Sequence, residues 1–355
     1  MARISYFLGA NTPGGFYSLM DKLLDPAKAR AIYILKGGPG CGKSTLMKRL
    51  GQWGEERGHT PEYIYCSGDP DSLDGVIFPD LAVAIADGTA PHVIEPKYPA
   101  AVECYVNLGE CYDRQELAFH KGEVMDLMAA YQAQYRRAYR CLKGAGQLLE
   151  DNRDLLETPE LQEKLRKRTR GIISREIPKR GPGGEVTERF LSAVSCQGPV
   201  CFFETADELC KRIYELSDSY GLAHAMLEEL LGAAVERGHR AVVCADPMAP
   251  RRIQHLLLPE LGVGFVTGSP RLPYPGNPYR RIRLDAMADQ ALLRRNRARV
   301  RFTKKVAGAL LDEGMETLAQ AKVLHDQLEA VYNPYVDFDR VERTAQALAA
   351  EIFAD

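Results

Sequence analysis

The chain has 355 residues, of which 45% are hydrophobic and 26% are charged, and its formal net charge is −2. These values are typical of an ordinary globular protein, and the near-neutral charge gives no general reason to expect nucleic acid or an anionic membrane as a partner. No apolar run approaches the about 20 residues that span a bilayer, and the nine cysteines include no Cys-x-x-Cys pair. We therefore expect a cytoplasmic protein with reduced thiols, and the length predicts two domains.

The first part of the chain alternates short apolar runs with amphipathic stretches. Residues 4–10 and 31–35 are predicted strands, and a glycine-rich turn joins the second of them to a helix that continues from Ser44. The apolar runs 62–66 and 82–86, bounded by Gly, Pro and Asp, are typical of buried parallel strands. Strands that alternate with helices predict an α/β fold with mainly parallel sheets.

The glycine-rich turn at residues 37–44, Gly-Gly-Pro-Gly-Cys-Gly-Lys-Ser, has the spacing G-x-x-x-x-G-K-[ST] of a phosphate-binding loop. Glycines let backbone N–H groups curl around a phosphate, and the helix that follows directs its positive end at the anion. Lys43 is predicted to reach the β- and γ-phosphates. The motif predicts binding of a nucleoside triphosphate, ATP with Mg²⁺, by Gly37, Gly38, Pro39, Gly40, Cys41, Gly42, Lys43, Ser44 and Thr45.

A P-loop enzyme also needs a carboxylate at the end of a neighbouring strand to hold Mg²⁺. The run Leu-Ala-Val-Ala-Ile-Ala-Asp ends at Asp87, which we predict to bind the metal together with the hydroxyl of Ser44. Lys43 and Asp87 are therefore the candidate catalytic residues. A turn-forming role for Asp87 before Gly88 is the alternative, and because residue 88 is not acidic, the residue that activates water stays unassigned.

Residues 67–75 contain Asp69, Asp71 and Asp74 directly after a predicted strand, on the side of the sheet where ligands bind. One of them is a candidate base or acceptor-binding residue. Asp-Pro and Asp-Gly are also ordinary turn sequences, and we favour that interpretation. His92 is likewise interpreted as structural.

From about residue 114 to 170 glycine and proline almost vanish and apolar residues recur at helical spacing, which predicts a long helical arm folded as a hairpin. Helix breakers gather at residues 178–185, so we place the principal linker there. The chain then divides into a first module, 1–180, and a second module, 181–355, with its own helical arm at about 286–355.

Two basic clusters lie on the first arm. We interpret them as solvated helix faces; a lid that clamps phosphate and a local nucleic-acid patch are the alternatives. The clusters consist of Arg136, Arg137 and Arg140, and of Lys164, Arg166, Lys167, Arg168 and Arg170.

The second module repeats the first. Residues 31–59 align with residues 212–239 after a single-residue gap, and both segments end in Glu-Arg-Gly-His. Apolar positions are kept, whereas the positions that carry P-loop chemistry have changed, so we expect a second module that folds like the first without binding nucleotide. The changes replace Gly37, Gly42, Lys43, Ser44 and Asp87 with Asp218, Ala223, His224, Ala225 and Thr267, respectively.

The segments 7–16, 36–45, 66–75 and 87–92 together resemble a poorly characterised bacterial family of tandem P-loop ATPases. The resemblance extends over nearly the whole chain. It implies duplicated P-loop modules and ATP binding, but no substrate. The family's motif carries over at Gly37, Gly42, Lys43 and Ser44.

The leading functional prediction is a Mg²⁺-dependent ATPase whose helical arms and second module transmit nucleotide state to a protein partner. A kinase acting on a small molecule or a nucleotide is the first alternative, because the loop also resembles those of nucleoside monophosphate kinases. A nucleotide-sensing module with negligible turnover is the second.

Overall fold

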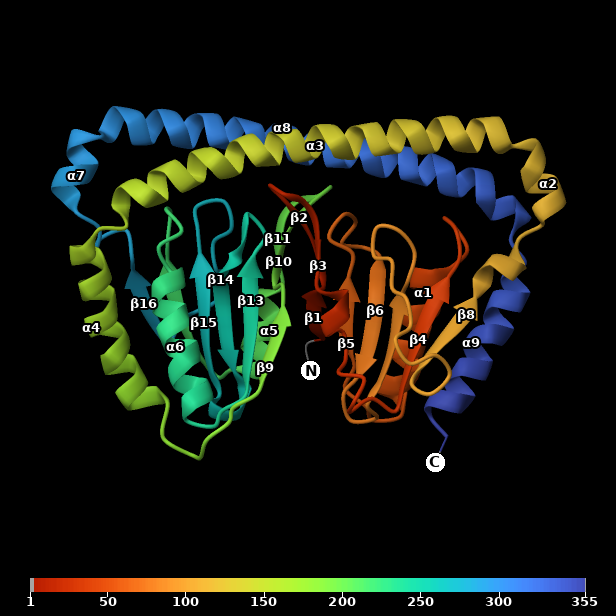
Figure 1. Cartoon of the computed structure of the whole chain (residues 1–355), viewed down its shortest axis with the longest axis horizontal. Helices are drawn as coiled ribbons and strands as arrows, with labels where there is room; N and C mark the ends of the chain where they lie inside the picture. The colour runs from red at the N-terminus through yellow and green to blue at the C-terminus, as the bar shows by residue number, and fades with distance from the viewer. Residues whose placement is uncertain (1–2, 355) are drawn as a thin grey trace.

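The computed structural model describes residues 3–354, and within them the chain forms two six-stranded sheets beneath two long helices (Figure 1). The first sheet has the strand order β1-β5-β6-β7-β4-β8. Its strands are β1 (Ile4–Phe7), β4 (Ala31–Lys36), β5 (Glu62–Tyr65), β6 (Leu73–Phe78), β7 (Val83–Asp87) and β8 (Glu103–Asn107).

The second sheet repeats this order strand for strand, as β9-β13-β14-β15-β12-β16. Its strands are β9 (Val186–Arg189), β12 (Arg212–Ser217), β13 (Ala241–Asp246), β14 (Ala249–Leu258), β15 (Val263–Gly268) and β16 (Arg280–Arg283). The registers also correspond, because Leu35 lies opposite Asp87 in the first sheet and Leu216 lies opposite Thr267 in the second.

The prediction of an α/β chain is confirmed, and parallel pairings predominate in both sheets. One correction is needed: β6 and β14 run antiparallel to both of their neighbours, so the sheets are mixed. Residues 67–75 were predicted as a turn, but β6 starts within them at Leu73. The connections from β5 to β6 and from β6 to β7 are too short for a parallel crossover, which requires a dozen or more residues.

The two sheets meet at their edge strands and share one hydrophobic core. Phe7 of β1 and Phe190 exchange two backbone hydrogen bonds of 2.9 Å each, and both side chains are fully buried with Leu8 and Leu191. Two hairpins adjoin this contact, β2 (Gly9–Thr12) with β3 (Gly15–Ser18) and β10 (Ser192–Ser195) with β11 (Gly198–Cys201).

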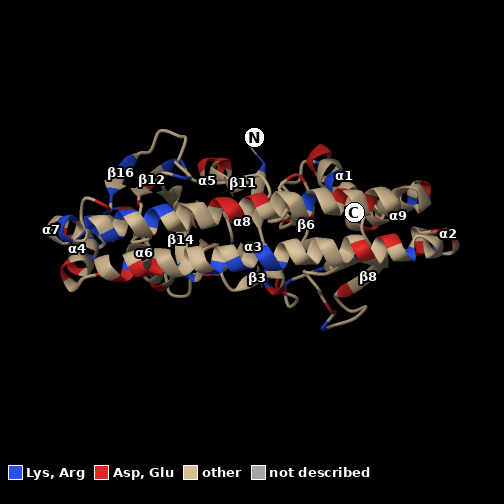
Figure 2. Cartoon of the chain, turned by 90° about the horizontal axis from the view of Figure 1, so that it is seen from above, with Lys and Arg blue, Asp and Glu red and all other residues tan. Residues whose placement is uncertain are grey.

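The long helices α3 (Lys121–Leu156) and α8 (Arg297–Tyr332) lie side by side in opposite directions across both sheets (Figures 1 and 2). The hairpin predicted for the first arm is therefore not formed, because α3 pairs with α8 of the second arm. The shorter helices are α1 (Lys43–Glu56), α2 (Arg114–Phe119), α4 (Pro159–Glu176), α5 (Phe203–Leu209), α6 (His224–Glu236), α7 (Gln290–Arg295) and α9 (Phe338–Ile352).

Each arm ends on the opposite sheet. The helix α4, which follows α3, packs against α6 of the second sheet, and α9, which follows α8, packs against α1 of the first. Apolar residues of α9 accordingly belong to the same core as Leu46 and Met47 of α1. None of the helices in residues 3–354 combines the length and the apolar character needed to cross a membrane.

The paired arms are expected to contribute substantially to stability. Leu142 of α3 is fully buried against Leu318 of α8 and Val194 of β10. Leu142→Ala should lower the free energy of unfolding by about 2–5 kcal/mol, measured by urea denaturation. Met125→Ala, at a position on the same helix that is 59% exposed, is the control, and an equal loss in both variants would contradict this role.

Candidate functional site

The glycine-rich loop connects β4 to α1, and its backbone requires glycine at two positions. Gly40 and Gly42 have φ values of +69° and +82°, which side chains disfavour. A Cβ at Gly40 would also collide with the side-chain amide of Asn333. The loop is therefore tightly curled and closely covered by residues from the end of the second arm.

Lys43 folds back over this loop at the start of α1. Its Nζ donates to the carbonyl oxygens of Gly37 at 2.7 Å and Gly38 at 2.9 Å and lies 3.6 Å from the carboxylate of Asp87. Asp87 reaches Lys43 because β7 runs parallel to β4, so both strands deliver their last residues to the same edge of the sheet.

All ten predicted site residues, 37–45 and Asp87, line one cavity of about 710 Å³. The hydroxyl of Ser44 accepts a hydrogen bond from the backbone N–H of Leu73 at 2.9 Å, which ties the start of α1 to β6. The structure thus brings the residues predicted from the loop and from the strand end together.

The three aspartates of residues 67–75 also line this cavity. Asp69 accepts from the backbone N–H of Asp71 at 3.2 Å, which is the turn interaction expected from the sequence. Asp71 in addition accepts from the side chain of Gln197 at 2.7 Å, which links the cavity to the hairpin of the second sheet. Asp74 differs, because it lies in β6 and is buried.

His92, which the sequence interpretation treats as structural, and Cys66, which it does not single out, also line the cavity. The His92 ring is buried, its Nε2 lies 3.0 Å from a carboxylate oxygen of Asp74, and the thiol of Cys66 lies close to both. Burial opposes protonation of His92, but the adjacent carboxylate of Asp74 together with the charge of Asp87 outweighs it, so the His92 pKa is raised. Loss of solvent contact raises the pKa of the Cys66 thiol. Cysteine spacing cannot reveal this arrangement, because the three residues come from separate segments of the chain.

The roof of the cavity comes from α3, through Tyr131 and Tyr135, from the C-terminal end of α8 and from the start of α9. Glu329 accepts a hydrogen bond from the backbone N–H of Gly40 at 3.2 Å, and Lys322 lies 3.4 Å from Asp69. His325, Asn333 and Phe338 complete this part of the lining. The residues from α8 onward lie almost 300 positions from the loop in sequence, so no local pattern signals them.

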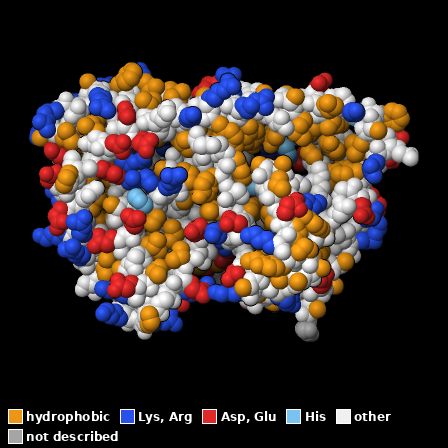
Figure 3. Space-filling model, in the orientation of Figure 1, with side chains coloured by type: hydrophobic (Ala, Val, Ile, Leu, Met, Phe, Trp, Pro, Cys, Tyr) orange, Lys and Arg blue, Asp and Glu red, His pale blue; other side chains and the backbone are white. Residues whose placement is uncertain are grey.

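The basic clusters of the first arm do not reach this cavity. All of their side chains are exposed, and Arg137, for example, pairs with Glu313 of α8 at 2.5 Å. Within residues 3–354 no arginine lines the cavity. On the face shown in Figure 3, acidic and basic side chains are interspersed, unlike the single-sign surface that favours nucleic acid.

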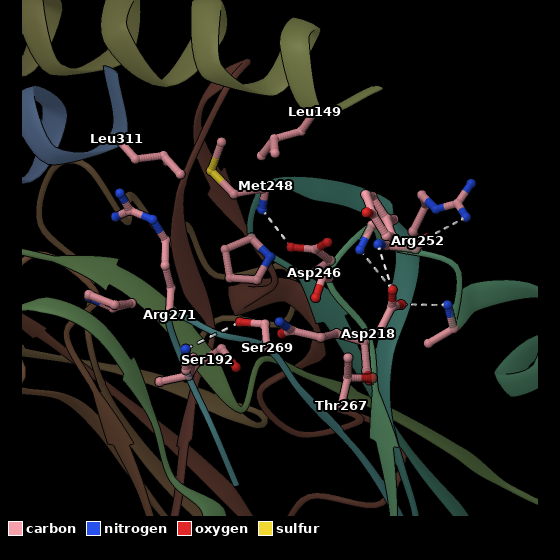
Figure 4. A pocket seen from close by; sticks show the side chains of 18 of the residues that line it. Leu149, Ser192, Asp218, Asp246, Met248, Arg252, Thr267, Ser269, Arg271 and Leu311 are labelled. Atoms are coloured by element: carbon pink, nitrogen blue, oxygen red, sulfur yellow. Dashed lines mark hydrogen bonds between the residues drawn. The ribbon is translucent and has the colours of Figure 1, made fainter. Parts of the chain in front are cut away.

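The second sheet carries a cavity of about 360 Å³ at the corresponding edge, shown in Figure 4. Its loop follows β12, and the carboxylate of Asp218 takes up the loop's backbone donors. One oxygen accepts from the N–H groups of Tyr220 and Gly221 at 2.9 Å each, and the other accepts from Ala223 at 2.8 Å. Three backbone donors of this loop thus bond to a carboxylate of the chain itself.

His224 and Thr267, which align with Lys43 and Asp87 in sequence, also make hydrogen bonds to the backbone of the second sheet. His224 accepts from the backbone N–H of Ile253 at 3.1 Å, and burial together with Arg252 lowers the His224 pKa, so the ring is neutral at pH 7. Thr267 donates to the carbonyl of Gln254 at 2.5 Å. The far wall, toward the arms, is apolar and includes Leu149, Met248 and Leu311 (Figure 4).

Comparison with known proteins identifies no relative of this chain. No family model, no curated protein and no solved structure matches the chain significantly. The resemblance to tandem P-loop ATPases therefore stays a prediction from the sequence motifs. The functional interpretation depends on the geometry of the two cavities.

The role of Asp218 can be tested by removing its carboxylate. Asp218→Ala would leave three loop N–H groups without their acceptor and should lower the free energy of unfolding by about 1–3 kcal/mol, measured by urea denaturation. Asp285→Ala is the matched control, because Asp285 accepts from the single loop N–H of Ser219 at 2.9 Å. A loss for Asp218→Ala no larger than for Asp285→Ala would contradict the role.

Proposed function

We propose that the chain is a Mg²⁺-dependent ATP-binding P-loop protein that hydrolyses ATP at the first cavity. The observation that carries the proposal is the convergence of Lys43, Ser44 and Asp87 with the curled loop in one cavity of about 710 Å³. A lysine, a hydroxyl and a strand-end carboxylate are the groups that P-loop enzymes use on the triphosphate and its metal.

The residues present fit this ligand chemically. The ammonium group of Lys43 already lies at the loop, where two carbonyls and a carboxylate hold it. It would therefore reach a triphosphate bound at the loop by a local rotation of its side chain. The hydroxyl of Ser44 and the carboxylate of Asp87 are hard oxygen ligands of the kind that Mg²⁺ prefers. When bound, Mg²⁺ would neutralise charge that develops on the phosphate oxygens.

We also propose that the two sheets are tandem P-loop-like modules, of which the second has lost nucleotide binding. The equal strand order, the equal strand directions and the corresponding registers support a duplication. Asp218 supports the loss, because a carboxylate already fills the loop and would repel a phosphate.

Glu329 gives the proposal a means of coupling nucleotide state to the arms. Its carboxylate accepts from Gly40 in the loop, where a phosphate would compete for the same N–H group. Binding of ATP would therefore displace Glu329 and shift the end of α8, which packs along α3. The protein partner that we propose would respond to such a shift of the arms.

The aspartates beside the loop favour a kinase as the second candidate. Asp69, Asp71 and Asp74 line the same cavity as Lys43 and could orient an acceptor hydroxyl. Phosphate release from ATP alone supports the ATPase, whereas ADP formation that requires an added acceptor supports the kinase. Tight binding without either product would indicate a nucleotide sensor.

The test of nucleotide binding is Lys43→Ala, studied by isothermal titration with ATP and Mg²⁺. Wild type should bind one ATP per chain, and the variant should lose about 2–3 kcal/mol of binding free energy, roughly 30- to 150-fold in affinity. His224→Ala, at the corresponding position of the second module, should leave the affinity unchanged. Retained affinity in Lys43→Ala, or two sites per chain, would refute the proposal.

Glu329→Gln tests the coupling, because glutamine keeps an oxygen for the Gly40 N–H but removes the negative charge. The ATP affinity should rise about fivefold, corresponding to about 1 kcal/mol. Glu316→Gln, at an exposed position of the same helix outside the cavity, is the control. An unchanged or lower affinity for Glu329→Gln in the same titration would count against competition between Glu329 and phosphate.

A further inference from the structure

A group of three different ligand types converges beside the phosphate-binding loop. Cys66 follows β5, Asp74 lies in β6 and His92 follows β7, and one potential ligand atom from each lies within 4.8 Å of the others. The antiparallel direction of β6 explains the convergence, because it brings the start of β6 to the edge where β5 and β7 end.

Two members of this group are buried without complete hydrogen bonding. Asp74 and His92 are 5% and 6% exposed. The Nε2 of His92 approaches the Oδ2 of Asp74 to 3.0 Å, but the pair is not aligned as a hydrogen bond. Among the described residues, neither that oxygen nor the Nδ1 of His92 has a hydrogen-bond partner. Buried polar atoms are rarely left in this state unless a ligand or an ion completes them.

The donor set selects the kind of ion. A thiolate, an imidazole and a carboxylate are the ligands of Zn²⁺, whereas Mg²⁺ prefers oxygen ligands alone. Three protein ligands also match a zinc site that keeps its fourth position for water or a substrate oxygen.

We propose that Cys66, Asp74 and His92 bind a zinc ion in the wall of the first cavity. The site is separate from the Mg²⁺ ligands Ser44 and Asp87 and does not depend on nucleotide binding. Zinc would join the ends of three neighbouring strands and present its open position to the same cavity as Lys43.

A second group, His325, Asp326 and Glu329, has a similar spacing on α8 but is a weaker candidate. Asp326 pairs with Lys322, and Glu329 accepts from Gly40, so both carboxylates already have partners. All three also come from one helix, whereas the Cys66 group is assembled from three chain segments.

The test is a Co²⁺ titration of the untagged, reduced full chain without nucleotide, in the presence of excess Mg²⁺ to exclude binding at Ser44 and Asp87. Wild type should bind one Co²⁺ per chain with a thiolate-to-cobalt charge-transfer band, and Zn²⁺ should displace it. Cys66→Ser should lose the band, and His92→Gln should lower the affinity at least about tenfold.

Cys201→Ser is the matched control, because the Cys201 sulfur lies 3.9 Å from the Nε2 of His255 but has Ser192 in place of a carboxylate. This variant and Lys43→Ala should keep the full band, and circular dichroism establishes that each variant is folded. In wild type, Zn²⁺ should also protect Cys66, but not Cys196, from alkylation, a readout that needs no variant.

Three results would overturn the proposal. They are an absence of stoichiometric Co²⁺ binding to wild type, a band that persists in Cys66→Ser, and a band lost in Cys201→Ser. Failure of ATP binding with an intact cobalt band would refute the P-loop function alone, so the two proposals fail separately.

Discussion

The packing of α3 against α8 is the constraint on which both cavities depend. The two helices run in opposite directions across the molecule. The C-terminal end of α3 therefore lies at the second sheet, and the C-terminal end of α8 lies at the first. The lining of the first cavity therefore includes Glu329 and Lys322 of α8 beside Tyr131 of α3, and that of the second includes Leu149 of α3 beside Leu311 of α8. Neither half of the chain encloses its own cavity. Each cavity is consequently in contact with a helix from the other half of the chain, so a change in the cavity can move that helix.

The two loops show how one backbone arrangement supports opposite chemistry. In the first loop the charged side chain is Lys43. Among the described residues, the only carboxylate that accepts from an N–H group of this loop is that of Glu329, which lies on α8. In the second, Asp218 comes from the loop itself and accepts three of its amides, so the anion is covalently part of the chain. An anion from outside can exchange with a phosphate, whereas an anion from within cannot leave. The second loop is therefore held in shape by its own carboxylate.

Local patterns predicted much of the first cavity, and they failed where a residue's role depends on distant packing. Residues 37–45 and Asp87 could be predicted because glycine spacing and a strand-end carboxylate are local signals, and parallel strands then place them together. Asp74 is interpreted as part of a turn because Asp-Gly hides the start of β6, and no local pattern connects it to His92. Glu329 could not be predicted, since helical periodicity gives the length of α8 but not the helix it pairs with.

The position of α9 has a consequence for the order in which the protein is made. Val341, Leu348 and Ile352 complete the core around α1, so the first sheet to leave the ribosome lacks part of its apolar cover until α9 has been synthesised. Leu46 and Met47 then stay incompletely covered until nearly 300 further residues have been synthesised. A chain that stops before α9 would expose this surface permanently. Synthesis of α9 therefore completes both this core and, through Phe338, the lining of the first cavity.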